Sequence, residues 1–174
     1  MVGMALLAPR IIDLLYGSAF APSQVSLIIL SFDIPLLLLT AFCGNITAAT
    51  GLEGPAARIY ISSVLMNVVL NLIFIPKYGM LAASVITIIT DFLSTAAFFV
   101  LLHRHMRIME ILPRLMTILL AAGLMGLGIW FAHPLPLFLL IALAGSGYIA
   151  LVWRLGAIDQ QALIKLRSLI PQRE

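Results

Sequence analysis

Charged side chains are scarce in this 174-residue chain, since Asp, Glu, Lys and Arg together make up only 10% of it. So few charges cannot cover an apolar surface in water, which excludes an ordinary soluble globular protein. A single cysteine, Cys43, excludes an intrachain disulfide and carries no information on the redox compartment. Hydrophobic residues are abundant instead, at 63%, and the mean hydropathy is +1.16. We therefore expect an integral membrane protein.

Long apolar runs divide the chain into candidate membrane spans. A helix needs about 20 apolar residues to cross a hydrocarbon layer about 30 Å thick. The first run, 1–15, is shorter and resembles the end of a span. A signal peptide is a competing interpretation of it, but no basic segment precedes its apolar stretch and no small-x-small motif follows. The sequence predicts an all-α polytopic membrane helix bundle with this partial N-terminal helix and five full transmembrane helices near 25–47, 59–76, 80–102, 113–132 and 135–153.

The pattern changes after Trp153 from continuous apolarity to an amphipathic one. Asp159 can cap a helix that presents leucines on one face and Lys165 and Arg167 on another. We expect this helix to lie on the inner membrane surface, with its cations near anionic lipid; a partner-binding helix is the alternative. The predicted parts are therefore a transmembrane region, 1–153, and a cytoplasmic amphipathic tail, 154–174.

The basic residues alternate between the predicted loops. One side of the membrane has only Lys77, and Arg10 lies inside the first segment. Because basic loops stay in the cytoplasm, this distribution predicts a multi-pass protein with a cytoplasmic C-terminus. The net charge of +3 then sets orientation, and we predict no nucleic-acid partner. The cytoplasmic side carries Arg58, Arg104, Arg107, Arg114, Arg154, Lys165, Arg167 and Arg173.

Two carboxylates fall inside predicted spans, where ionisable groups normally face a cavity or a partner. Asp33 lies two residues before Pro35, which bends the helix and frees a backbone carbonyl. A broken helix beside a carboxylate is a common setting for a solute site, whereas hydration at the external surface explains Asp33 equally well. Asp91 lies near the middle of the run 80–102, which favours an internal position.

Polar side chains recur at helical spacing on both sides of the predicted turn at Pro76–Gly79. They form one stripe in 63–71 and another in 84–94, so two neighbouring helices each offer a polar face. Hydrogen bonding between helices accounts for the asparagines as well as a substrate role does. With Asp91 included, we favour a cavity. The predicted substrate-binding or cavity-lining residues are Arg10, Asp33, Ser63, Asn67, Asn71, Thr87 and Asp91.

Catalytic and metal-binding signals are missing from the sequence. No serine, cysteine or carboxylate has a plausible base beside it, and no glycine-rich phosphate loop is present. His103 and His105 alternate without a third ligand nearby. We predict that the chain is not an enzyme and has neither a metal site nor a cofactor.

Two segments carry a resemblance to a known family. Residues 14–20, LLYGSAF, are similar to an external turn, and Ile75-Pro76-Lys77-Tyr78-Gly79 to a second, more specific one. In the residues of these segments and in their order, the chain resembles bacterial polysaccharide biosynthesis flippases of the O-antigen type, in the multidrug/oligosaccharidyl-lipid/polysaccharide exporter superfamily. The resemblance covers residues 5–105.

The resemblance implies a transporter that flips polyprenyl-pyrophosphate-linked oligosaccharide across the bacterial cytoplasmic (inner) membrane for polysaccharide or lipopolysaccharide biosynthesis. Cations often meet the pyrophosphate in this family, and Arg10 is the embedded candidate. Such exporters rock two helical lobes against each other. This chain is then a partial C-terminal lobe, whose partners are membrane lipids, the lipid-linked oligosaccharide, and a missing N-terminal portion or complementary half. The alternatives are a small structural or assembly membrane protein, or part of a related drug or peptidoglycan-precursor exporter.

Overall fold

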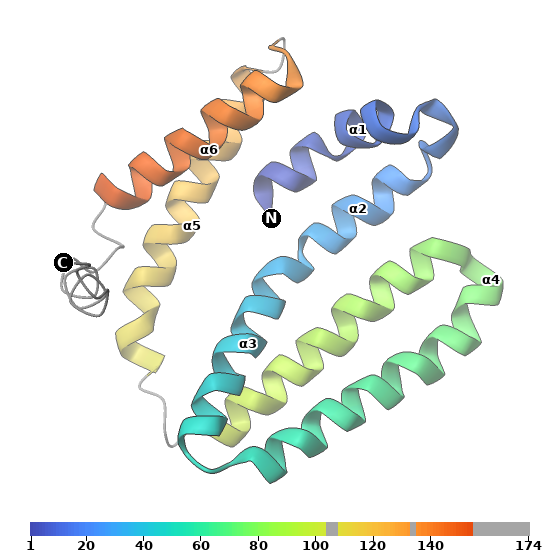
Figure 1. The fold of residues 1–174 in the computed structure, drawn as a ribbon, viewed down its shortest axis with the longest axis vertical. Coiled ribbons are helices and arrows are strands. Elements are labelled where there is room, and N and C mark those ends of the chain that lie inside the picture. Colours follow the sequence, from blue (N-terminus) through green and yellow to red (C-terminus); the bar gives the residue numbers. More distant parts are fainter. Residues whose placement is uncertain (104–107, 133–134, 155–174) are drawn as a thin grey trace, which may run out of the picture. The chain divides into compact units, whose positions relative to one another are not determined.

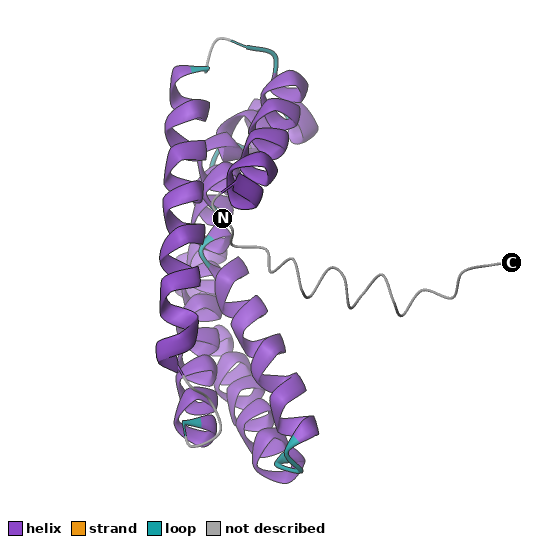
Figure 2. Cartoon of the chain, turned by 90° about the vertical axis from the view of Figure 1, so that its left-hand side faces the viewer, coloured by secondary structure: helices purple, strands orange, loops and turns teal. Residues whose placement is uncertain are grey.

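The computed structural model describes residues 1–103, 108–132 and 135–154, in which all regular secondary structure is helical (Figure 2). The chain divides into two compact units, Met1–Ile108 and Met109–Glu174, and each is described by itself. The predicted tail, 154–174, lies outside the described residues apart from Arg154, which ends the last helix.

The first unit begins with three short helices. Helix α1 covers Val2–Tyr16, the 3-10 turn η1 covers Ser18–Phe20, and α2 covers Ser23–Ser31. Between α1 and η1, Gly17 has φ 76°, a conformation that a residue without a β-carbon adopts at little cost. Helix α3 (Asp33–Ala49) follows α2 after Phe32 alone, so the break predicted beside Asp33 lies at the α2–α3 junction. Pro35 is tolerated there because first-turn N–H groups have no helical acceptor.

Helix α4 (Glu53–Leu102) is folded into a hairpin (Figure 1). The reversal lies at Gly79, where φ is 61° and ψ is −143°, a non-helical conformation that a side chain would strain. We call residues 53–78 the first arm and residues 80–102 the second arm. Pro76 comes just before the reversal, as the predicted turn required.

Packing in this unit centres on the second arm. Helices α2 and α3 pack against α4, and α1 packs against α2. Phe98 is fully buried in a cluster with Cys43 and Leu102, and its ring centroid lies 4.9 Å from that of Tyr60 on the first arm. The Tyr60 hydroxyl lies so close to Gly44 that a β-carbon there would come within 3.0 Å of it. The end of the hairpin opposite Gly79 is therefore held by aromatic contacts and by close approach of α3.

The second unit contains most of α5 (Ile108–Phe131) and all of α6 (Leu137–Arg154). The two helices lie side by side in Figures 1 and 2, and residues from both line one apolar groove of about 250 Å³. Ile129 of α5 and Leu140 of α6 are buried along it.

The predicted bundle of five full transmembrane helices is wrong. Within the described residues only two helices, Ser23–Ala49 and Glu53–Leu102, are long and apolar enough to cross a membrane. The runs 59–76 and 80–102 lie in the two arms of α4, which meet at the non-helical Gly79. The described apolar parts of α5 and α6, Leu120–Phe131 and Leu137–Leu151, are shorter than a bilayer requires.

Candidate functional site

Polar side chains from α3 and from both arms of α4 meet around the second arm. We call this group the polar seam: Asp33, Thr40, Ser63, Asn67, Asn71, Thr90, Asp91 and Thr95. At its centre Thr90 is fully buried and accepts a 3.0 Å hydrogen bond at Oγ1 from Asn67 Nδ2 of the first arm. The Thr90 hydroxyl donates to backbone carbonyls of its own helix, 3.0 Å away at Ile86 and 2.9 Å away at Thr87.

The seam continues along the first arm. Asn71 Nδ2 donates to Asn67 Oδ1 at 2.8 Å, and Asn67 Nδ2 donates to Thr90, so the two hydrogen bonds form a chain with the same donor-to-acceptor direction. At the far end of this relay Asn71 Oδ1 is buried and has no hydrogen-bond partner. The two asparagines line a groove of about 310 Å³ that reaches Pro76. The relay therefore ends in an acceptor that a hydroxyl or amide donor could satisfy.

The two intramembrane carboxylates predicted from sequence are neighbours. Asp33 begins α3 and is 6% exposed, and its carboxyl lies near the half-buried Asp91 carboxyl on the second arm. Asp33 Oδ1 has no hydrogen-bond partner. Two carboxylates at this separation repel each other unless a proton or a cation lies between them.

A pair of threonines fixes α3 beside Asp91. Thr40 Oγ1 and Thr95 Oγ1 are 2.8 Å apart, and the Thr95 hydroxyl donates to the Asp91 carbonyl oxygen at 2.7 Å. Because Thr95 directs its proton to the Asp91 carbonyl, its oxygen can accept a hydrogen bond from Thr40. This contact holds the Asp91 backbone at a fixed distance from α3, next to the Asp33 carboxyl.

The remaining predicted residues divide into two groups. Ser63 belongs to the seam, since its hydroxyl donates to the Thr90 carbonyl oxygen at 3.4 Å. Thr87 instead donates to the carbonyl oxygen of Ala83, 2.9 Å away in its own helix. Arg10 is half-buried in α1, a helix that packs mainly against α2. The structure therefore brings together five of the predicted residues, Asp33, Ser63, Asn67, Asn71 and Asp91.

Sequence reasoning missed Thr40, Thr90 and Thr95. Thr90 lies three residues after Thr87 and four before Ser94, so helical spacing marks its face. Spacing alone does not separate a threonine that contacts another helix from one that bonds only its own preceding turn. Thr40 is isolated among leucines and gave no signal.

We predict that Asn67 and Thr90 are energetically coupled. Thr90→Val keeps the side-chain shape but removes the acceptor of the Asn67 amide, so each single variant, Thr90→Val or Asn67→Leu, should lower the free energy of unfolding by roughly 1 to 2 kcal/mol. The double variant should cost less than the sum. Reversible unfolding in mixed micelles measures all three. Thr87→Val is the control, because its hydroxyl bonds only its own helix, and strict additivity of the pair would contradict the prediction.

No protein family and no solved structure matches the chain. Two curated proteins are similar to part of it. The probable low-salt glycan biosynthesis flippase Agl15 of Haloferax volcanii is 30% identical over 103 residues, which are 59% of this chain and 21% of the relative. The capsular polysaccharide biosynthesis protein CapF of Staphylococcus aureus is 27% identical over 93 residues, 53% of this chain and 24% of the relative.

The matched segments thus span about a fifth to a quarter of the length of these relatives. They support similarity to flippase-type proteins without fixing the bacterial O-antigen type that the sequence patterns suggested. Together with the two apolar helices of the first unit, they indicate a membrane protein that is similar to proteins of glycan and capsular polysaccharide biosynthesis.

Proposed function

We propose that the chain is the C-terminal part of a transporter that flips polyprenyl-pyrophosphate-linked oligosaccharide across the bacterial cytoplasmic membrane. The two relatives, a probable glycan biosynthesis flippase and a capsular polysaccharide biosynthesis protein, support this role. The proposal makes the chain a transport protein rather than an enzyme. Because alternating access needs two opposed surfaces, its partner is an N-terminal portion or a complementary half.

The depth of the polar seam is the observation that carries the proposal. At 1.5 Å per residue, Asn67 lies about 18 Å and Thr90 about 16 Å from the reversal at Gly79. If that reversal lies at one membrane surface, both side chains lie near the middle of a hydrocarbon layer about 30 Å thick. Polar groups at this depth are costly unless they serve a pathway or each other. In exporters of this architecture, substrate sites lie near the midplane.

The orientation proposed for the chain follows from the arms. Lys77 lies beside the reversal and Arg58 near the opposite end of the first arm. With Arg58 and the arginine-rich residues 104–114 in the cytoplasm, the reversal at Gly79 faces the exterior and the C-terminus is cytoplasmic. Accessibility of a C-terminal tag to an impermeant reagent in intact cells tests this orientation.

A specific observation favours the structural alternative. Ser63, Asn67 and Thr90 donate their hydrogen bonds to acceptors inside the hairpin. This arrangement is expected when polar groups serve only to join helices. Unpartnered Asn71 Oδ1 and Asp33 Oδ1 argue for a further ligand. A purely structural role predicts that variants of Asp33 or Asp91 change protein level and glycan export in parallel.

Deletion of the coding sequence in its own organism tests the transport proposal. We expect surface glycan to fall and lipid-linked oligosaccharide to accumulate in the inner leaflet, with recovery on re-expression of the chain. Unchanged glycan and leaflet distribution would overturn the proposal. Unchanged glycan with altered drug resistance, or with accumulated peptidoglycan precursor, would assign the chain to a related exporter.

A further inference from the structure

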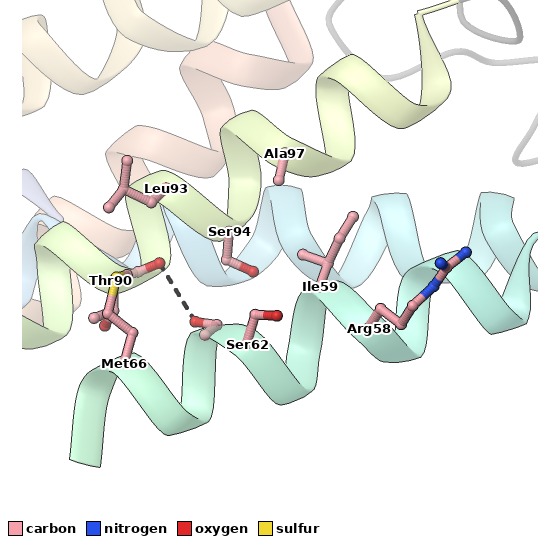
Figure 3. A pocket seen from close by; sticks show the side chains of 9 residues that line it. Arg58, Ile59, Ser62, Met66, Thr90, Leu93, Ser94 and Ala97 are labelled. Atoms are coloured by element: carbon pink, nitrogen blue, oxygen red, sulfur yellow. Dashed lines mark hydrogen bonds between the residues drawn. The ribbon is translucent and has the colours of Figure 1, made fainter. Parts of the chain in front are cut away.

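A second groove lies between the two arms of α4, nearer their open end than the asparagines (Figure 3). Its volume is about 320 Å³. Arg58 lies at one end and Met66 at the other, while Ser62 of the first arm and Ser94 of the second line the space between them. Leu93 and Ala97 complete the wall of the second arm. The groove therefore changes from cationic through hydroxyl-bearing to apolar along its length.

The polar groups of this groove are not used by the fold. Ser94 is 7% exposed, yet within the described residues neither its hydroxyl nor that of Ser62 has a hydrogen-bond partner. Arg58 has no ion-pair partner in the same part of the chain, and no other charged residue lines the groove. Ser63 differs, because its hydroxyl donates to the Thr90 carbonyl oxygen. Arg58 and Ser62 are exposed and Ser94 lies beside them in the groove, so all three groups can bind acceptors from outside the chain.

The spacing of these groups matches the layers of a membrane leaflet. Helix geometry places Arg58 about 31 Å from the reversal at Gly79, which is close to the thickness of the hydrocarbon layer. On the same scale Ser62 lies about 25 Å and Ser94 about 22 Å from the reversal, and Met66 about 20 Å. With the reversal at one surface, Arg58 is at the headgroup level of the other. The two serines are then just below it, and the apolar end reaches into the acyl region.

We propose that this groove binds an anionic diacyl glycerophospholipid of the leaflet that Arg58 faces. The guanidinium pairs with the phosphate, the Ser62 and Ser94 hydroxyls donate to the acyl-ester carbonyls, and one chain lies along Met66 and Leu93. The phosphate and the ester carbonyls of this lipid thus lie at the same membrane depths as the guanidinium and the two hydroxyls that would bind them. The site requires α4 to lie in a bilayer, but it does not depend on glycan transport.

Other anions fit the groove less completely. Inorganic phosphate would satisfy Arg58 but leaves the apolar end and the buried Ser94 hydroxyl without a partner. A polyprenyl phosphate fills the apolar end but has no ester carbonyls for the two serines. A diether phospholipid has the phosphate and the chains but also lacks the carbonyls, so it is the sharpest comparison.

Lipid binding to the whole purified chain tests the site. Phosphatidylglycerol is titrated into mixed micelles, and bound lipid is counted by native mass spectrometry. We expect Arg58→Gln to weaken binding about tenfold or more, through loss of a charge-assisted hydrogen bond. Ser62→Ala with Ser94→Ala should weaken binding of the diacyl lipid but not of diether phosphatidylglycerol. Lys77→Gln is the matched control, because it removes a cation at the opposite end of the first arm.

Several results would overturn the site. One is equal loss of binding in Arg58→Gln and Lys77→Gln, which would indicate diffuse charge attraction only. Another is equal binding of inorganic phosphate, or displacement of the phospholipid by polyprenyl phosphate at lower concentration, which would make the groove a substrate subsite. Unchanged helical circular dichroism of the variants keeps these outcomes separate from misfolding. If Arg58→Gln fails to fold, the serine pair alone still decides between diacyl and diether lipid.

Discussion

Replacing Asp91 by alanine is expected to lower glycan export about tenfold or more in cells that depend on this chain. Asp91 lies at mid-depth on the second arm, and its carboxyl is the immediate neighbour of the buried Asp33 carboxyl. Removing it leaves Asp33 alone at a site built for a pair, so whatever the pair binds or exchanges during transport loses one of its two anchors. Surface glycan, normalised to the level of membrane-inserted protein, is the measurement.

Asp13→Ala is the matched control, because it removes a carboxylate from an exposed position at the end of α1, where its Oδ1 accepts a hydrogen bond from Gln24. We expect it to export normally. Asp33→Ala should reproduce the Asp91→Ala defect, and the double variant should be no worse than either single one. Normal export by Asp91→Ala at equal protein level would remove the carboxyl pair from the mechanism.

Phe98→Ala is expected to cause the largest loss of stability, about 3 kcal/mol or more in the free energy of unfolding. Phe98 is fully buried where the second arm meets α3, and its ring packs against Tyr60 on the first arm. The substitution opens a cavity that joins three helical segments at once, and the bilayer does not fill it. Thermal unfolding followed by far-ultraviolet circular dichroism in micelles measures the loss.

Phe92→Ala is the control for this effect, because Phe92 lies on the same arm and is 60% exposed. Its ring faces the surroundings rather than a core, so we expect its loss to change stability by less than about 1 kcal/mol. Equal destabilisation by the two variants would mean that the cluster around Phe98 does not hold the hairpin together.

Part of this fold could be predicted from local patterns. The apolar periods and the Pro76–Gly79 sequence predicted a turn within 59–102, and the structure has its reversal at Gly79. Five complete spans were wrong because hydropathy windows measure apolar length, whereas a helix must also be continuous and long enough. At Gly79 the backbone leaves the helical conformation and reverses, and within the described residues only Ser23–Ala49 and Glu53–Leu102 are long and apolar enough to cross a membrane.

The candidate site was only half visible in the sequence. Helical spacing placed Asn67, Asn71 and Asp91 on polar faces, but spacing cannot say which face of another helix lies opposite. Asp33 and Asp91 became a pair through packing of α3 on the second arm, which no local pattern predicts. The roles of Thr40 and Thr95 were missed for the same reason, because no local pattern shows that a threonine contacts another helix.

The reversal at Gly79 also bears on how this protein is made. An arm released alone into lipid would lack the hydrogen bond between the Asn67 amide and the Thr90 hydroxyl oxygen, which the folded pair has already formed. Entry of both arms into lipid as one antiparallel unit would therefore cost less free energy than entry of either arm alone. Gly79, which adopts φ 61° at little cost, is the residue that lets the two arms form this unit.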